Sequence, residues 1–153
     1  MDFDRTLIGA ANGNGANDFG CAFGTPACDS SRVQDFRRLR VWRKASGLAI
    51  NTRRATERFP RSGYAELKAQ IVSAAESVVI NIVEGCGASS QKDFARFLSI
   101  SIKSAMELEG ELELARGYGI MPEADWLARQ TEIIETRQML HSLRKKVLGA
   151  DLS

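Results

Sequence analysis

Apolar residues recur three and four positions apart along most of the chain, from about residue 36 to residue 147. This spacing places apolar side chains on one side of an α-helix. It predicts four helices, over about 36–58, over about 62–84, from Ser90 to the Gly-Tyr-Gly at 117–119, and from Pro122 to Val147. The predicted core positions are Val41, Ala45, Leu48, Thr52, Ala55 and Phe59, then Leu67, Ile71, Ala74, Val78 and Ile82, then Phe94, Leu98, Ser101, Ala105, Leu108, Leu112 and Ala115, and finally Trp126, Ile133, Ile134, Leu140, Leu143 and Val147.

The breaks between these segments contain residues that end or start helices. Pro60 ends the first helix because a residue before proline is pushed out of the helical region. Ser90, three residues before Asp93, fits a capping box, and Gly149 suits a helix C-cap. No stretch has the two-residue alternation of a strand, and short connections favour antiparallel neighbours. We therefore predict an all-α, antiparallel up-down-up-down four-helix bundle.

The composition changes near residue 32. Residues 1–33 are rich in glycine and asparagine and lack periodicity, so we predict a flexible or irregular N-terminal segment. The bundle is expected over 34–149, with a tail at 150–153. A natural translation start near Val33 is an alternative. The glycines do not form a dinucleotide-binding fingerprint, because Asp18 stands where the third glycine is required.

The chain has the composition of a globular protein, with 44% hydrophobic and 26% charged residues. It has neither eighteen consecutive apolar residues nor the basic start of a signal peptide. We therefore expect a cytoplasmic protein that does not bind membranes. The three cysteines favour free thiols, and a disulfide between Cys21 and Cys28 is the alternative.

Positive charge is concentrated in the first helix. The net charge is only +2, but residues 32–61 contain ten Arg or Lys and two acidic residues. Five of these cations keep helical spacing, and they are Arg37, Arg40, Lys44, Arg54 and Arg58. Such a stripe suits nucleic-acid phosphates. It equally suits the acidic third helix of a neighbouring copy, since complementary surfaces favour a head-to-tail ring.

The residue pattern does not indicate a catalytic site or a metal site. The single histidine, His141, has Gln138 three residues before it, which excludes the Glu-x-x-His pairs of a di-iron bundle. His141 is expected at the surface or partly buried, and no catalytic triad is available. The third helix carries two i,i+4 glutamate pairs, Glu107 with Glu111 and Glu109 with Glu113. We interpret them as solvated or intersubunit charges, with a cation site as the alternative, and expect neither cofactor nor enzymatic activity.

The second helix ends in a distinctive stretch, "SVVINIVEGCGASSQKDF", at residues 77–94. Asn81 continues the apolar stripe, so its amide is expected to face the interior and to be hydrogen-bonded there. Its expected partners are the backbone at 85–89 or a side chain of a neighbouring helix. Gly85 and Gly87 are expected to adopt left-handed or tight-turn conformations. Asn81, Glu84 and Gly85 thus indicate a structural corner or, alternatively, a ligand site at the end of the bundle.

Several stretches resemble a known family. They are "FRRLRVWRKASGLA", "TERFP", "QIVSAAESVVINIVEG" and "SSQKDFARFLSISIKSAMELEGELELA". They are similar to the four-helix-bundle proteins associated with intervening sequences in 23S ribosomal RNA genes. The resemblance runs from about Phe36 to Val147, and its most specific part is Asn81-Ile82-x-Glu84-Gly85.

The resemblance implies a cytosolic bundle without an established enzymatic role that assembles into a ring, commonly a pentamer. A more distant similarity, to the accessory protein of diversity-generating retroelements, implies binding to a reverse transcriptase and nucleic acid. The chain departs from the family at Val79, Lys103 and Ala88, where proline, glycine and arginine are usual, and at 72–73, where a basic pair is usual. The lost cations weaken the implied nucleic-acid role of the second helix and its loop.

Overall fold

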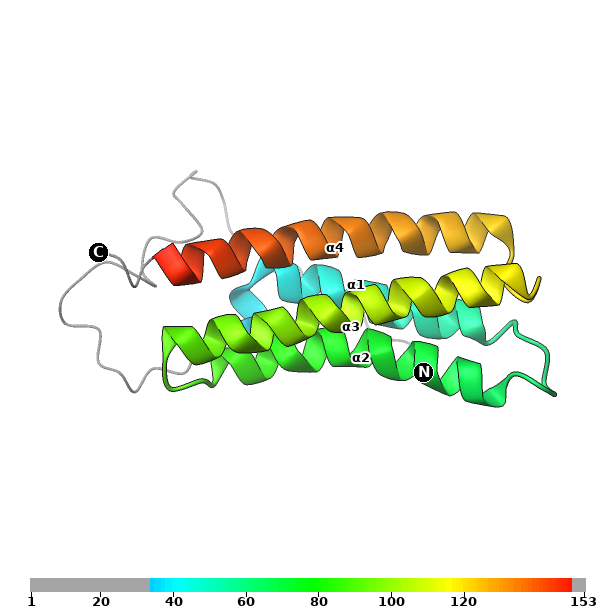
Figure 1. Ribbon diagram of the computed structural model, residues 1–153, viewed down its shortest axis with the longest axis horizontal. Coiled ribbons are helices and arrows are strands. Elements are labelled where there is room, and N and C mark those ends of the chain that lie inside the picture. Colours follow the sequence, from blue (N-terminus) through cyan, green and yellow to red (C-terminus); the bar gives the residue numbers. More distant parts are fainter. Residues whose placement is uncertain (1–33, 150–153) are drawn as a thin grey trace, which may run out of the picture.

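The computed structural model describes residues 34–149, which form four long helices and one short turn of 3-10 helix. The 3-10 turn η1 is Phe36–Arg38, and the helices are α1 (Arg40–Thr56), α2 (Ala65–Cys86), α3 (Gln91–Gly117) and α4 (Glu123–Gly149). Successive helices run in opposite directions, and α4 packs against both α3 and α1 to close the bundle (Figure 1). The predicted all-α four-helix bundle is confirmed.

The helix ends differ from the predicted ends for local reasons. The Asp35 side chain accepts a hydrogen bond from the Arg37 N–H at 3.0 Å and caps η1. Leu39 is extended, with ψ 121°, so α1 begins only at Arg40. At the end of α2, Gly85 and Cys86 are still helical. Gly149 lies in the last turn of α4 rather than beyond it.

The N-terminus of α3 is capped as predicted. The Asp93 N–H donates to Ser90 Oγ at 3.0 Å, and Ser90 Oγ donates to Asp93 Oδ2 at 3.1 Å. The cap satisfies a backbone N–H that has no partner inside the helix.

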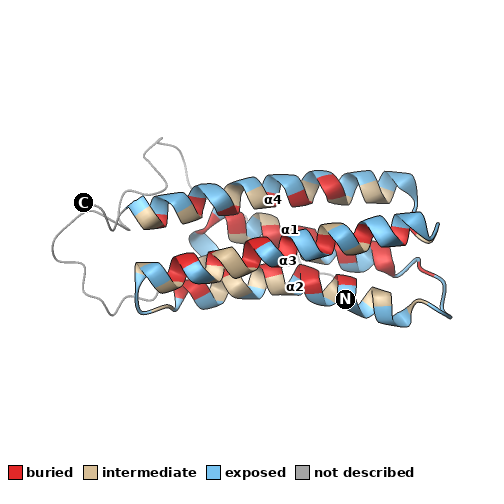
Figure 2. Ribbon diagram, in the orientation of Figure 1, coloured by how far each residue is buried: buried red, intermediate tan, exposed pale blue. Residues whose placement is uncertain are grey.

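The core lies along the inward stripes of all four helices (Figure 2). Every predicted core position of the first and third helices is buried. The prediction is wrong at Ile134, which is 41% exposed. Two polar residues, Gln130 and Thr136, are buried on α4 instead. Thr136 is tolerated there because its hydroxyl donates to the Glu132 carbonyl at 2.7 Å.

Gly63 and Gly119 have positive φ values, 89° and 71°, which favour glycine in the loops before α2 and α4. Cys86 is a buried free thiol, whereas the expectations for Cys21 and Cys28 concern residues outside 34–149. By length and composition α2 would also suit a membrane span. Its residues Ile71, Val78 and Ile82 are fully buried in the bundle, as in a core helix.

Candidate nucleic-acid interface

The five cations of the predicted stripe do not form one continuous surface. Arg37 lies in η1, stacked on the Phe36 ring at 4.6 Å and 3.5 Å from Asp35. Arg40 and Lys44 face the groove between α1 and α4. Arg54 lies near the opposite end of α1 and Arg58 just beyond that end, both more than one helical turn beyond Lys44. The stripe is therefore two separate groups of cations.

The antiparallel arrangement of α1 and α4 decides what each group faces. The first half of α4 is mostly acidic, with Glu123, Asp125, Glu132 and Glu135 against Arg129, which pairs with Glu132, and the second half is basic, with Arg137, Arg144, Lys145 and Lys146. The C-terminal end of α1 consequently faces acids, and Arg58 forms an ion pair with Asp125 at 2.9 Å. The N-terminal end of α1 faces the basic half of α4, where positive charge accumulates.

A groove with a volume of about 830 Å³ lies between these two basic ends. We call it the basic groove. Its charged lining is Arg38, Arg40, Arg43, Lys44, Lys146 and one carboxylate, Glu135, and its apolar lining is Leu39, Val41, Met139 and Leu143. The formal charge of this lining is +4. Leu39, Val41 and Leu143 are buried in the core and Met139 is partly buried, so the accessible surface of the groove is mainly cationic and suits a polyanion.

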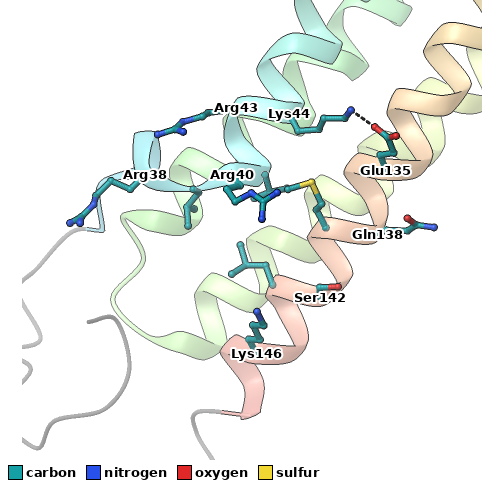
Figure 3. Close-up of a pocket in the computed structure, with 12 residues that line it drawn as sticks. Arg38, Arg40, Arg43, Lys44, Glu135, Gln138, Ser142 and Lys146 are labelled. Carbon is teal, nitrogen blue, oxygen red and sulfur yellow. Dashed lines mark ion pairs between the residues drawn. The ribbon is translucent and has the colours of Figure 1, made fainter. Parts of the chain in front are cut away.

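The side chains of the basic groove are held in different ways (Figure 3). Lys44 points toward α4 and forms an ion pair with Glu135. Arg43 lies at the start of α1, where its Nε donates to the Arg37 carbonyl at 3.2 Å and ties η1 to the helix. Arg38 and Arg40 are exposed. Glu135 neutralises Lys44, and Arg38, Arg40 and Arg43 leave an excess of positive charge at this end.

The backbone of α1 adds to this positive charge. The first turn of α1 contains no acidic residue, and its N-cap, Leu39, has no side chain that accepts a hydrogen bond from the backbone. The N-terminus of a helix carries a partial positive charge, which acidic side chains usually offset. Arg40 at this end is therefore electrostatically unfavourable for the isolated chain, an arrangement typical of functional sites.

Three cations of the basic groove were absent from the predicted site. Arg38 and Arg43 belong to the same basic run as Arg40, so they could have been predicted from the local positive charge of residues 32–61. Lys146 comes from α4, whose five cations and four carboxylates give a net charge of only +1 when they are counted together. Only the packing of α4 against α1 shows that its basic half belongs to the site.

The predicted corner at the end of α2 has a different structure from the one expected. Asn81 is only partly buried, and its Nδ2 donates to the Ser77 carbonyl at 2.8 Å and to Ser77 Oγ at 3.1 Å. Ser77 Oγ lies 2.8 Å from Ser104 Oγ on α3. The amide therefore bonds within its own helix and reaches α3 through Ser77, rather than through the loop. Glu84 is exposed.

Neither Gly85 nor Gly87 is left-handed: Gly85 is still helical, which corrects the prediction, whereas Gly87 lies in a tight turn, as the alternative expectation stated. In the described chain only Gly63 and Gly119 have positive φ. Gly85 is needed for a different reason, because a Cβ there would lie 2.6 Å from Phe94 Cδ2 and 3.2 Å from Phe97 Cβ. The family motif thus includes a close approach of α2 to α3, which indicates a structural role for Gly85.

The acidic residues of α3 separate into different environments. Glu109 forms an ion pair with Arg137 of α4, so this carboxylate is used within the chain rather than between copies. Glu113 lies 3.8 Å from Arg116 on its own helix. One oxygen of Glu111 is buried without a hydrogen-bond partner. Among residues 34–149 no group of three His, Cys, Asp or Glu residues is placed to hold a metal ion.

Glu111 has an unusual protonation equilibrium. Burial of the carboxyl raises its pKa from 4.5 to about 7, and the nearby charge of Glu107 contributes in the same direction. A carboxyl whose pKa is raised in the folded state binds a proton more tightly when folded than when unfolded. Its contribution to stability therefore falls as the pH rises from about 4.5 to about 7.

Because the charged form of Glu111 lowers stability at high pH, removing its charge should stabilise the protein there. Glu111→Gln keeps the shape of the neutral carboxyl and removes the charged form, so the variant should be more stable than the parent at pH 8.5 and nearly equal to it at pH 4.5. Because the side chain is partly exposed, solvent screening limits the gain to about 2–4 °C in Tm at pH 8.5. Thermal unfolding followed by circular dichroism measures this difference. Glu113→Gln at an exposed site is the control, and an equal gain in both variants would contradict the assignment.

The sequence and the fold were compared with those of known proteins. The comparison with curated proteins gives no match. A solved structure with a similar fold is that of a protein with unknown function from the S23 ribosomal protein family of Bacteroides thetaiotaomicron. It is 24% identical with a TM-score of 0.64, and the match covers 69% of this chain and 95% of that one. This likeness bears on the fold alone.

A family match goes further than the structural likeness. The family model described as "23S rRNA-intervening sequence protein" matches residues 37–142, which extend from η1 through most of α4. The distant similarity to the retroelement accessory protein stays a prediction. The match spans more than half of the chain, and the chain therefore belongs to the 23S rRNA-intervening sequence protein family.

Proposed function

We propose that the protein is a cytoplasmic, non-enzymatic, nucleic-acid-associated protein whose basic groove binds the phosphates of RNA or DNA. One observation carries the proposal, namely that five cations and a single carboxylate line the groove between α1 and α4. Clustered cations attract a phosphate backbone and displace its condensed counterions, which supplies most of the affinity in sequence-independent binding. The membership of the family is compatible with this function but does not specify it.

The chemistry of the groove favours contacts with the backbone over contacts with bases. The aromatic side chains near it are already engaged, because Phe36 and Trp42 lie 5.1 Å apart and Arg37 stacks on Phe36. Arginine and lysine then supply the polar contacts, and phosphate contacts position a nucleic acid without reading its sequence. We therefore expect broad binding to structured RNA and duplex DNA, without marked sequence preference.

The test is fluorescence anisotropy with a labelled RNA hairpin and a labelled DNA duplex at about 50 mM and about 200 mM salt. If four phosphates are contacted, affinity should fall by roughly a hundredfold between the two conditions. Size-exclusion chromatography should show that the protein remains folded and in one assembly state at both salt concentrations. An intact protein without binding at low salt would overturn the proposal.

A second candidate function, a protein-interaction oligomer without a nucleic-acid role, is favoured by the outer surface of α4. Leu127 is 58% exposed and Ile134 is 41% exposed, and the two lie seven residues apart on the same side of the helix. Apolar side chains at this spacing are typical of helices that pack against a partner. A cyclic homo-oligomer, a pentamer by the family resemblance, would cover such residues.

The assembly can be measured independently of nucleic acid. Light scattering behind size exclusion should give several times the chain mass of 16.8 kDa. Replacing Leu127 and Ile134 by serine should reduce the assembled mass without unfolding the bundle, because neither side chain belongs to the buried core. A clean monomer of the parent at micromolar concentration would contradict the oligomer.

A further inference from the structure

We infer that the acidic N-terminal segment of this chain, residues 1–31, occupies the basic groove and competes there with nucleic acid. The competition rests on the proposed function, whereas occupancy of the groove by the segment is a separate claim. Three features support occupancy: the charge of the segment, its point of attachment and the lining of the groove. None of these depends on a conformation of residues 1–31.

The charges of the segment and the groove are opposite. Residues 1–31 contain four aspartates and one arginine, a formal charge of −3. The groove lining has a formal charge of +4, with Glu135 as its only carboxylate. Opposite potentials of this size favour contact and steer the encounter.

Apolar contacts can add to this attraction at one place in the groove. The segment contains Met1, Phe3, Leu7, Ile8, Phe19 and Phe23. Leu39, Val41 and Leu143 of the groove lining are buried in the core, whereas Met139 is only partly buried. A segment with aspartates between apolar residues can place its carboxylates on the cations while one apolar side chain covers Met139.

The point at which the segment joins the bundle lies close to the groove in the chain. The Gln34 N–H donates to the Cys86 carbonyl at 3.2 Å, which fixes where the chain enters the bundle. Arg38, the first residue of the groove lining, follows four residues later. An extended chain spans about 3.3–3.6 Å per residue, so Asp29 lies within about 18 Å of Gln34 and Asp18 can reach any part of the groove. Covalent attachment gives an effective concentration of about millimolar, so even a weak contact would be substantially populated.

This contact should reduce the affinity for nucleic acid. The segment must leave the groove before phosphates enter, and the apparent affinity falls with the fraction of empty groove. Removing residues 1–31 should therefore tighten binding to a DNA duplex about three- to tenfold at 50 mM salt, with a smaller effect at 200 mM, where screening weakens the contact. A variant with the four aspartates replaced by asparagine should bind as tightly as the truncated chain.

A matched control separates occupancy of the groove from a general change in net charge. Glu57→Gln, Glu66→Gln and Glu113→Gln together add the same three positive charges at exposed positions outside the groove. The inference predicts that this triple variant binds DNA nearly as the parent does. An equal gain in the triple variant, or no gain in the truncated chain, would overturn it. If neither the full chain nor the truncated chain binds, the proposed function fails and the next measurement still tests occupancy.

Carbodiimide cross-linking tests occupancy in the full chain without nucleic acid. The reagent joins a carboxylate and an amine that are in contact, and the ion pair of Lys44 with Glu135 provides an internal reference. Peptide mass spectrometry should find segment aspartates joined to Lys146 or Lys44, and not to Lys68 or Lys103 elsewhere on the bundle. High salt should abolish these links. Absence of segment links to the groove at low salt, or equal linking to Lys68 and Lys103, would overturn the inference.

Discussion

Gly85→Val is expected to destabilise the bundle by about 2–3 kcal/mol, the usual cost of forcing extra atoms into a packed interior. A Cβ at Gly85 would lie 2.6 Å from the ring of Phe94, which is only 6% exposed and has little room to move. It would also lie 3.2 Å from Phe97 Cβ, an atom fixed by the backbone of α3. Valine adds two more carbons at this point, so the two helices must separate. Chemical denaturation measures the loss as a lower midpoint.

A pair of alanine variants isolates the steric effect. Glycine inside a helix costs about 0.5–1 kcal/mol relative to alanine, so Gly110→Ala, where a Cβ meets nothing within 4 Å, should stabilise α3 by about that amount. Gly85→Ala should instead destabilise, because the contact with Phe94 outweighs the gain in helix propensity. An equal gain in both variants would show that α2 and α3 do not approach each other closely at Gly85.

The second large effect concerns the basic groove. Arg38→Gln with Arg40→Gln should weaken binding to a DNA duplex by about tenfold at 50 mM salt and make the slope of log K against log salt shallower by about 1–2. Both side chains are exposed, so the change removes charge without opening the core. Fluorescence anisotropy across a salt series measures both quantities.

The control for this double variant changes the same charge at the other end of α1. Arg53 and Arg61 are exposed and lie outside the groove lining. Arg53→Gln with Arg61→Gln should leave affinity within about twofold of the parent, because these cations do not contact the bound phosphates. Equal losses in the two double variants would mean that net charge, rather than the groove, determines binding.

The fold was predictable because the core repeats locally. Val41, Leu48 and Leu108 occupy positions that any helix with this spacing must bury, and all three are buried. The prediction failed at Ile134 because hydrophobicity alone does not show which side of a helix faces its neighbours. It also misjudged Gly85, since a glycine required for close packing and a glycine required for positive φ look identical in a sequence.

The candidate site was predictable only in part. Arg40 and Lys44 followed from the basic character of residues 32–61. Lys146 and Glu135 did not, because they come from a helix about a hundred residues further along the chain. Likewise, the pairing of Arg58 with Asp125 shows that part of the basic stripe is used inside the bundle. Antiparallel packing determines which cations pair with carboxylates of a neighbouring helix and which gather without such carboxylates. A local sequence pattern does not predict this.

The central claim is that nucleic acid binds in the basic groove, and lysine footprinting tests it most directly. The protein is acetylated briefly with and without a saturating DNA duplex at 50 mM salt, and peptide mass spectrometry measures the modification of each lysine. Bound DNA should protect Lys146 and Lys44 of the groove severalfold and leave Lys68 and Lys103 unchanged. Protection of Lys68 and Lys103 with no change at Lys44 and Lys146 would contradict the account.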